Sequence, residues 1–303
     1  MQPLQLSSGD LLADRRADYA EMLFANGEHQ AAAELMLGAL ELAPSWALGW
    51  FRMGEMQEAA GALGPAAEAW RTALKLDPAD RAGAALKLEL IGQAPASSAP
   101  PSRFVEALFD QYADTFEASL VDKLEYRVPD LLAAAVTATG RAHFRGAIDL
   151  GCGTGLMGEK LRPLCDVLEG VDISAAMLRK AKARGIYDRL TKADLQAFAP
   201  NAGSVDLVTA ADVFMYVGAL HAIVARVAAA LSPGGLFAFS VERYDGPEPF
   251  ALRETRRYAH AQVYVEQILA GGRLALLSLS QEQIRRDRNA PVHGMVVVAR
   301  APG

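Results

Sequence analysis

Cysteine, long apolar runs and an excess of positive charge are all scarce in this sequence. Its 303 residues include two cysteines, Cys152 and Cys165, which have neither the spacing of a metal site nor the number needed for a disulfide framework. No run of about 18 apolar residues occurs, and the first residues lack the basic start and apolar core of a signal peptide. We therefore expect a cytoplasmic protein that holds no metal and neither binds nor spans a membrane.

The charge balance also argues against one class of partner. The chain has 30 Lys and Arg residues against 36 Asp and Glu residues, which gives a formal net charge of −6. Nucleic acid is therefore not the expected partner, because its phosphate backbone attracts basic proteins. A composition that is 51% hydrophobic and 22% charged is typical of a globular protein, and the length leaves room for about two domains.

Residues 11–92 have helical periodicity, no strand pattern and an internal repeat. The repeat offset is 34 residues, and the matching pairs are Gly27 and Gly61, Ala32 and Ala66, Ala33 and Ala67, Glu34 and Glu68, Leu40 and Leu74, Leu42 and Leu76, and Pro44 and Pro78. This period resembles that of tetratricopeptide repeats, in which small residues let paired helices approach closely. The resemblance implies an all-α domain over residues 1–92, with Trp46, Trp50 and Trp70 at core positions.

Two roles are open for this helical domain. It could present a surface to a partner protein or to a second copy of the chain, or it could only pack on the rest of the molecule. Residues 93–102 are rich in Pro, Ala and Ser, which predicts a linker. A second domain is then expected over residues 103–303.

The stretch 147–155 reads as the end of a buried parallel strand followed by a turn with Gly151, Gly153 and Gly155. Helical spacing begins directly after it, so bare backbone N–H groups at a helix start could contact a polar ligand. A second strand pattern ends at Asp172, 21 residues after Gly151. That spacing would let the Asp172 carboxylate bind the two hydroxyls of a ribose held over the glycines.

Two cofactors could bind such an arrangement, a nicotinamide dinucleotide or S-adenosylmethionine, and the sequence favours the second. A dinucleotide fingerprint has its third glycine one residue later than Gly155, and Asp149, just before the turn, would repel a pyrophosphate. S-adenosylmethionine carries an ammonium and a sulfonium, which an acid at this position favours. A nicotinamide-dependent oxidoreductase is therefore the weaker alternative.

The segments D-L-G-C-G-T-G at 149–155 and G-V-D-I-S at 170–174 resemble motifs I and II of the class I S-adenosylmethionine-dependent methyltransferases. The resemblance implies an α/β fold with a Rossmann-like sheet of seven strands, of which the last pair is antiparallel. In that family the positions of Ile173 and Met177 flank adenine, and a third motif similar to residues 191–195 binds its amino group. The implied cofactor-binding residues are Asp149, Gly151, Cys152, Gly153, Gly155, Asp172, Ile173, Met177, Asp194, Leu195 and Asp212.

Several of these residues have ordinary structural alternatives. Cys152 is expected to be a small residue filling the glycine turn rather than a nucleophile. Met177 could simply belong to the core of a helix that Ser174 caps. Asp194 could cap the segment that follows it, and Asp212 could cap the next helix.

Aromatic residues at 109, 112 and 116 share one helix face near the start of the second domain. An F-D-x-x-A-x-x-Y/F segment similar to this one folds over the cofactor as a lid in many small-molecule methyltransferases. The resemblance implies a helical lid over about 103–138, with Tyr112 at the methionine end or the substrate, whereas Phe109 and Phe116 could equally form a plain core. The run from F-D-Q-Y to L-E-Y-R-V-P looks like a bacterial family of predicted methyltransferases with N-terminal tetratricopeptide repeats.

The acceptor side is expected after a strand at 204–211, where residues 212–216 replace the N-P-P-Y or D-P-P-Y of amino methyltransferases. This departure disfavours methylation of a base nitrogen, and it makes Tyr216 a candidate beside the substrate. After the fifth strand, a helix is predicted to start at Tyr258, and residues 273–279 and 292–299 are predicted to form the final antiparallel pair. His260 could act as a general base or be structural.

Three arginines precede His260: Arg253, Arg256 and Arg257. They would suit an anionic substrate group, although a solvated loop would also explain them. The predicted catalytic residues are Tyr112, Tyr216 and His260.

These patterns predict an S-adenosylmethionine-dependent methyltransferase that acts on an oxygen or nitrogen atom of a small molecule or protein side chain and releases S-adenosylhomocysteine. The alternative is a tetratricopeptide interaction or scaffold protein whose methyltransferase domain is inactive or senses the cofactor.

Overall fold

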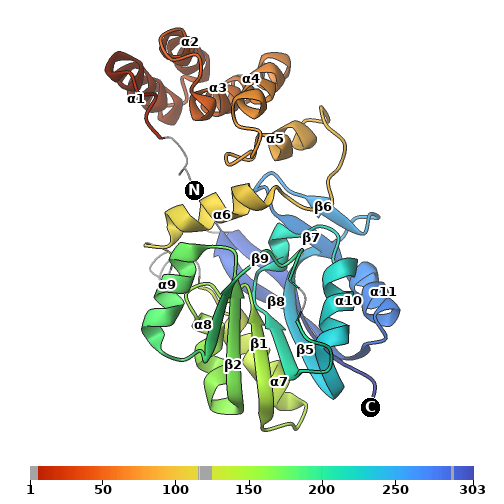
Figure 1. Cartoon of the computed structure of the whole chain (residues 1–303). Helices are drawn as coiled ribbons and strands as arrows, with labels where there is room; N and C mark the ends of the chain where they lie inside the picture. Colours follow the sequence, from red (N-terminus) through yellow and green to blue (C-terminus); the bar gives the residue numbers. More distant parts are fainter. Residues whose placement is uncertain (1–5, 115, 117–124, 199, 288–289) are drawn as a thin grey trace. The chain divides into compact units, whose positions relative to one another are not determined.

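The computed structural model describes residues 6–114, 116, 125–198, 200–287 and 290–303 (Figure 1). The chain divides into two compact units, Met1–Leu108 and Phe109–Gly303. Helix α6 (Ser102–Tyr112) crosses this division, which lies after the predicted linker at 93–102. The domain limits given by the sequence stay a prediction.

The N-terminal unit consists of helices. Its first five are α1 (Leu11–Ala25), α2 (His29–Leu40), α3 (Ala47–Ala59), α4 (Leu63–Leu76) and α5 (Ala84–Leu90). Asp10 starts α1, because its side chain accepts hydrogen bonds from the backbone N–H groups of Leu12 and Ala13. The predicted all-helical N-terminal region is confirmed.

Tryptophan packing fixes the core of these helices. Trp70 is fully buried against Gly54, where a Cβ atom would lie 2.2 Å from the indole Nε1. The same Nε1 donates to the Phe51 carbonyl at 3.1 Å, and the Trp50 indole donates to the Pro44 carbonyl at 2.9 Å. Because the indoles are held by packing and by backbone carbonyls, these tryptophans serve the core, as predicted.

The C-terminal unit is built on one mixed sheet. Its strands are β1 (Phe144–Leu150), β2 (Cys165–Asp172), β3 (Arg189–Lys192), β4 (Val205–Ala210), β5 (Leu231–Tyr244), β6 (Phe250–Leu252), β7 (Tyr258–Ala261), β8 (Ala275–Asp287) and β9 (Ala290–Arg300). The first five pair in parallel in the order β3-β2-β1-β4-β5. Strand β9 pairs antiparallel with β5, and β8 antiparallel with β9. The predicted Rossmann-like sheet with an antiparallel final pair is confirmed.

Helices cover both faces of this sheet (Figure 1). Helices α7 (Val128–Ala138) and α8 (Leu156–Leu161) bury apolar side chains against one face, together with Ala147 and Leu168. Helices α10 (His221–Ala230) and α11 (Gln262–Gly271) do so on the other face, together with Ile148 and Leu150. Alternate residues of β1 therefore enter opposite cores, as expected for a central strand buried on both sides. Helix α9 (Ala175–Arg184) connects β2 to β3.

The short strands β6 and β7 were not predicted, and they extend the sheet. Glu242 of β5 pairs with Gly294 of β9 and also with Ala259 of β7. Because a strand has only two edges, β7 occupies the edge of β5 that β4 leaves free beyond its last residue. The prediction of a helix starting at Tyr258 is wrong: residues 258–261 form β7, and the helix starts at Gln262. Pairing with a distant strand outweighs the local pattern here.

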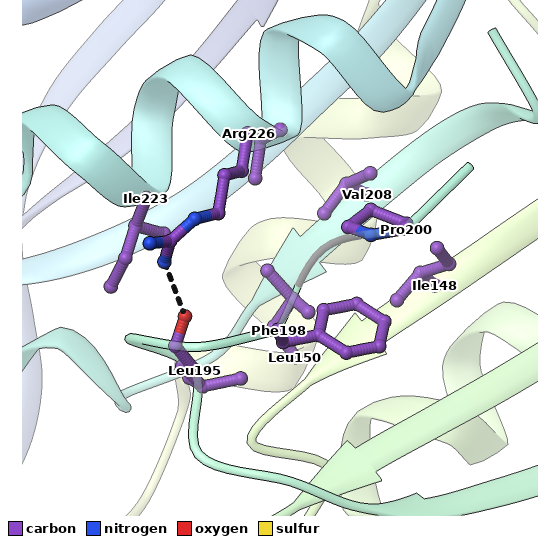
Figure 2. A pocket seen from close by; sticks show the side chains of 9 residues that line it. Ile148, Leu150, Leu195, Phe198, Pro200, Val208, Ile223 and Arg226 are labelled. Carbon is purple, nitrogen blue, oxygen red and sulfur yellow. Dashed lines mark hydrogen bonds between the residues drawn. The ribbon is translucent and has the colours of Figure 1, made fainter. Parts of the chain in front are cut away.

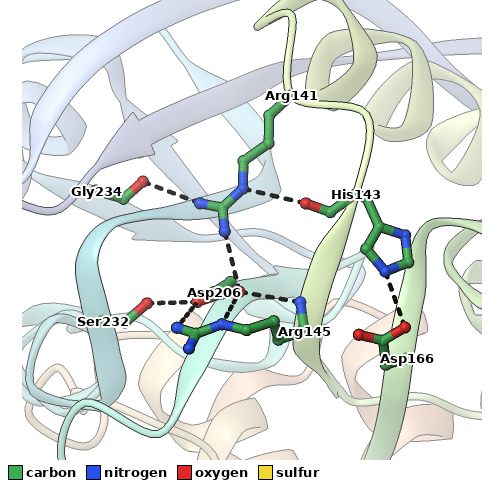
Figure 3. Close-up of polar contacts among 7 residues, drawn as sticks. All are labelled: Arg141, His143, Arg145, Asp166, Asp206, Ser232 and Gly234. Carbon is green, nitrogen blue, oxygen red and sulfur yellow. Dashed lines mark hydrogen bonds and ion pairs between the residues drawn. The ribbon is translucent and has the colours of Figure 1, made fainter.

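A network of ion pairs and hydrogen bonds stabilises the N-terminal edge of the sheet, where the parallel strands β1 and β4 begin (Figure 3). The buried Asp206 of β4 accepts hydrogen bonds from the Arg145 guanidinium and backbone N–H and from the Ser232 hydroxyl. Arg141 forms an ion pair with the same carboxylate at 3.0 Å. These partners lower the pKa of Asp206 well below its ordinary value despite its burial.

Throughout the described part of the chain, each helix is too short or too polar to be a candidate for crossing a bilayer.

Candidate active site

The glycine turn lies between β1 and α8 and requires glycine for two reasons. Gly151, Gly153 and Gly155 have φ values of +65°, +53° and +103°, which other residues rarely adopt. A Cβ atom on Gly151 would lie 2.3 Å from Val213 Cγ2, whereas one on Gly153 would meet only the Phe116 ring, at 3.9 Å. The backbone at Gly153 is therefore accessible to a ligand that approaches it closely.

Asp172 joins this turn to the helix after β2. One carboxylate oxygen accepts from the Gly153 N–H at 2.9 Å, and the other accepts from the Ser174 N–H at 2.8 Å. Burial raises the pKa of Asp172 to about 6. Each oxygen can accept a further hydrogen bond, so the carboxylate can also receive two hydroxyls. The structure thus brings Asp172 and the glycine turn together, as the sequence spacing suggests.

Asp149 is fully buried at the end of β1. It accepts hydrogen bonds from the Tyr187 hydroxyl at 2.8 Å and the Thr209 hydroxyl at 3.0 Å. Burial raises its pKa to about 7. Cys152 is buried too, and burial raises the pKa of its thiol, so its environment is that of a small packing residue rather than a nucleophile.

The start of α9 carries a contact that the sequence did not reveal. Ser174 caps the helix, as predicted, by accepting from the Met177 N–H at 3.1 Å. Its hydroxyl donates in turn to Asp110 at 2.5 Å, and Asp110 also accepts from the Ala176 N–H at 3.2 Å. Met177 is fully buried. The segment carrying Asp110 is therefore fastened to the helix whose first turn adjoins Asp172.

The aromatic residues of that segment divide into two kinds. Phe109 and Phe116 pack against Ala113, Ala176 and Met177. Phe109 also contacts the Tyr216 ring edge-on, with 5.2 Å between centroids. Tyr112, by contrast, is 51% exposed. This exposure does not fit the predicted contact of Tyr112 with cofactor or substrate, and Phe109 is the residue that reaches Tyr216.

The remaining predicted cofactor residues lie at the ends of β2 and β3. Ile173 is half-buried after β2. One Asp194 carboxylate oxygen accepts from the Gln196 N–H at 2.8 Å, and its carbonyl accepts from Ala197 and Phe198. This is the capping role named as the alternative, and adenine recognition by Asp194 stays a prediction.

Leu195 lines an apolar pocket on the α10 face of the sheet (Figure 2). The other lining residues are Ile148, Leu150, Phe198, Pro200, Val208, Ile223, Arg226 and Val227. The Arg226 guanidinium donates to the Leu195 and Gln196 carbonyls. With its charged group bound in this way, the pocket offers packing surface rather than reactive groups.

A buried ionic cluster lies just beyond β4. Asp212 has a φ of +54°, unusual for a residue other than glycine, and its N–H donates to the Ser240 hydroxyl at 2.9 Å. Its carboxylate accepts from one terminal nitrogen of Arg285 at 2.6 and 2.8 Å, and the other terminal nitrogen pairs with Glu242. Arg285 is only 1% exposed. Asp212 therefore forms a buried ion pair and is not the cap of the next helix.

Tyrosines and a second arginine adjoin this cluster. Arg257 pairs with Asp287 at 3.0 Å and lies close enough to Tyr216 for the two groups to interact electrostatically. Arg257 and Arg285 are close enough for their charges to oppose each other. Burial raises the pKa of Tyr126 well above its ordinary value, and the nearby Asp212 and Asp149 charges add to this effect. Tyr126 thus lies close enough to Asp149 and Asp212 for both carboxylates to affect its pKa.

His260 is fully buried on β7, and its Nε2 lies 2.9 and 3.0 Å from the Val217 and Gly218 carbonyls. Because carbonyls only accept, Nε2 must carry the proton. Burial lowers the pKa of His260 to about 4. A weakly basic imidazole that donates to two backbone carbonyls has a structural role, which does not fit the predicted general base.

Sequence reasoning missed Arg285, Glu242, Tyr126 and Asp110. Arg285 and Glu242 lie in strands whose patterns predict only pairing, and they meet because β5, β9 and β8 are neighbours. The available signal was the charge of Glu242, which follows the buried stretch 236–241 of β5, whereas Arg285 lies in a polar part of β8.

This architecture defines the class of protein. A solved structure of Burkholderia thailandensis 1,6-didemethyltoxoflavin-N1-methyltransferase, with 1,6-didemethyltoxoflavin and S-adenosylhomocysteine bound, is similar with a TM-score of 0.53 at 18% identity, over 69% of this chain and 94% of that chain. Magnesium protoporphyrin IX methyltransferase from Synechocystis, with bound S-adenosylhomocysteine, gives a TM-score of 0.52 at 19% identity, over 66% and 99%. The fold is that of the class I S-adenosylmethionine-dependent methyltransferases.

Sequence comparison agrees with this class. Residues 148–237 match a family model described as a methyltransferase domain. The chain is 35% identical over 133 residues to a trans-aconitate 2-methyltransferase of Paracidovorax citrulli, covering 42% of this chain and 50% of that protein. It is 33% identical over 107 residues to a ubiquinone biosynthesis O-methyltransferase of Burkholderia lata, covering 33% and 46%. The chain spans about half the length of the curated relatives it matches.

Proposed function

We propose that the protein transfers the methyl group of S-adenosylmethionine to an oxygen or nitrogen atom of a small-molecule acceptor. The Asp172 carboxylate beside the accessible Gly153 backbone is the observation that carries this proposal. It suits a ribose whose hydroxyls donate to an acid, and Asp149 suits the positive charge of the cofactor. When bound, S-adenosylmethionine supplies the activated methyl group and the leaving group.

The chain's own residues then bind the cofactor and orient it towards the acceptor. Phe109 and Phe116 pack against Ala176 and Met177 of α9, and Phe109 contacts Tyr216, which supports a covering segment that keeps water from the transferred methyl group. Asp110 fastens this segment to the first turn of α9. Names of relatives favour an oxygen acceptor, because they include trans-aconitate 2-methyltransferases and ubiquinone biosynthesis O-methyltransferases.

Calorimetric titration of the full chain with S-adenosylhomocysteine tests the proposal. We expect saturable binding that Asp172→Ala weakens about 10- to 100-fold, because hydrogen bonds to a charged group contribute about 1.5–3 kcal/mol each. Asp166→Asn is the control, since Asp166 is exposed and its carboxylate pairs with His143 on the surface. Absence of heat with saturating ligand would remove the enzyme hypothesis and leave the interaction or scaffold protein.

We propose further that the N-terminal helices are tetratricopeptide-like and bind a protein partner or a second copy of the chain. The support is the 34-residue repeat offset and the recurrence of small residues against large ones, as at Gly54 and Trp70. A cytoplasmic location stays a prediction of the sequence.

A further inference from the structure

The buried cluster beyond β4, formed by Asp212, Glu242 and Arg285, has an N–H donor that none of its acceptors binds. Arg285 has five N–H donors, and its Nε has no hydrogen-bond partner among the described residues. Leaving a buried donor unpaired costs about 1–3 kcal/mol, so such a donor indicates a missing acceptor. Tyr216 lies close to Arg257, and its hydroxyl can donate as well as accept.

The carboxylates of this cluster that the structure describes are poor proton acceptors, because they are held in ion pairs. Among the described residues there, Asp212 and Glu242 are both ion-paired with Arg285. His260 donates through Nε2 and is weakly basic. An alcohol or a protonated amine would need a base before it could attack, whereas a carboxylate is already ionised at neutral pH.

The charges agree with this reasoning. Arg257 and Arg285 balance Asp212 and Glu242 within the cluster. Asp287, the other partner of Arg257, is 30% exposed, so that water screens its charge. Of the three carboxylates paired with Arg257 and Arg285, Asp287 is therefore the one that competes least with an anionic acceptor.

The location also fits an acceptor. Strand β7 continues the sheet beyond the end of β4, so residues 253–257, directly before it, lie at the edge where the acceptor of an open α/β sheet binds. Tyr216 connects this edge to Phe109 of the covering segment.

We propose that the acceptor is a carboxylate, which Arg257, Arg285 and Tyr216 hold by donating hydrogen bonds, and that the product is a methyl ester. A carboxylate oxygen attacks the methyl carbon as the carbon–sulfur bond breaks. The electron pair goes to sulfur, giving S-adenosylhomocysteine, and no proton is transferred. This inference rests on the proposed methyltransferase function and narrows its acceptor.

The test uses the full chain with methyl-tritiated S-adenosylmethionine and four acids: malonate, fumarate, tricarballylate and benzoate. The corresponding amides are the matched non-ionised probes. We expect label on at least one acid and on none of the amides. Alkaline hydrolysis should release this label as volatile methanol, since esters hydrolyse and ethers or methylamines do not.

Arg257→Gln tests the recognition step. We expect kcat/KM to fall at least about 10-fold, mostly through KM, with S-adenosylhomocysteine affinity unchanged, because the guanidinium contacts the acceptor and not the cofactor. Arg253→Gln is the matched control, since Arg253 is exposed and donates to the Arg243 carbonyl. Arg257 is partly exposed, so its loss should not prevent folding.

Three outcomes overturn the proposal: label that resists alkali, an acid panel that takes no label, or an Arg257→Gln enzyme with unchanged kinetics on an acid. If S-adenosylhomocysteine still binds in those cases, the methyltransferase function stands and only the carboxylate acceptor is wrong. If it does not bind, the proposed function itself fails.

Discussion

At the scale of single residues, two buried carboxyl groups dominate the site. Burial raises the pKa of Asp149 to about 7 and that of Asp172 to about 6. The ligand-free fold therefore favours their protonated forms, whereas a cationic cofactor favours the ionised forms. Stability and binding consequently depend on pH in opposite directions.

Cofactor affinity should rise with pH. We expect S-adenosylmethionine to bind at least about 10-fold more tightly at pH 8 than at pH 5. Below their raised pKa values, Asp149 and Asp172 must each lose a proton before they can bind the cationic cofactor as carboxylates. Calorimetry over this range measures the change, and Asp149→Asn should remove its upper step, near pH 7. An affinity independent of pH in the native chain would contradict the assignment of these acids to the cofactor.

The stability effect of Asp149 has the opposite sign. A carboxyl group whose pKa is raised in the folded state contributes most to stability at pH values below the pKa that it has in the unfolded chain. For Asp149 this contribution is lost as pH rises through about 7. Asp149→Asn should therefore raise the urea midpoint of the ligand-free protein at pH 8 and change it little at pH 4. A lower midpoint at pH 8 would show that the ionised carboxylate stabilises the fold.

At the scale of elements, the two edges of the sheet carry different kinds of ionic cluster. At the N-terminal edge, Asp206 is bound by exposed arginines, a serine and a backbone N–H (Figure 3). At the C-terminal edge, Asp212 is bound by Arg285, which is buried and retains an unpaired donor. The first arrangement is complete and serves stability, whereas the second has capacity for a ligand.

Replacing Asp206 with Ala should lower the free energy of unfolding by about 2 kcal/mol, since a buried carboxylate with several donors is lost but its arginine partners remain hydrated. Urea denaturation at pH 7 measures this. Because its pKa is lowered in the fold, Asp206 stabilises the protein at pH values above the pKa that it has in the unfolded chain. The difference in free energy of unfolding between the native chain and the variant should therefore shrink as pH falls below about 4. Asp166→Asn should change stability by less than about 0.5 kcal/mol, and S-adenosylhomocysteine affinity should stay unchanged in both variants.

At the scale of the whole molecule, the chain combines a helical unit with a unit that has the fold of the class I methyltransferases. The helices of the first bury alanines and tryptophans among themselves, and the sheet of the second has its own two cores. Each unit thus has the packing of an independent domain.

Limited proteolysis should cut the chain within residues 93–102, because this Pro- and Ser-rich stretch contains no helix or strand before Ser102. We expect a C-terminal fragment that still binds S-adenosylhomocysteine, detected by mass spectrometry and calorimetry. First cuts inside α3 or β1 would instead show that the units do not fold as separate bodies.

The sequence alone determined the features that depend on neighbouring residues. The glycine turn, the acid 21 residues after Gly151 and the Ser174 cap are short-range patterns, and the structure places them together. The final two strands were predicted as well, and their antiparallel pairing was implied by the resemblance to the methyltransferase family. Ligand contacts of the predicted site residues stay predictions.

Only the tertiary structure decided the acceptor side. Strand β7 exists because β5 extends beyond β4, and Arg285 meets Asp212 across 73 positions of sequence. His260 became buried through that same strand, while Phe109 rather than Tyr112 reached Tyr216. Such contacts depend on which strands become neighbours and how far each one extends, and no local pattern of residues encodes that.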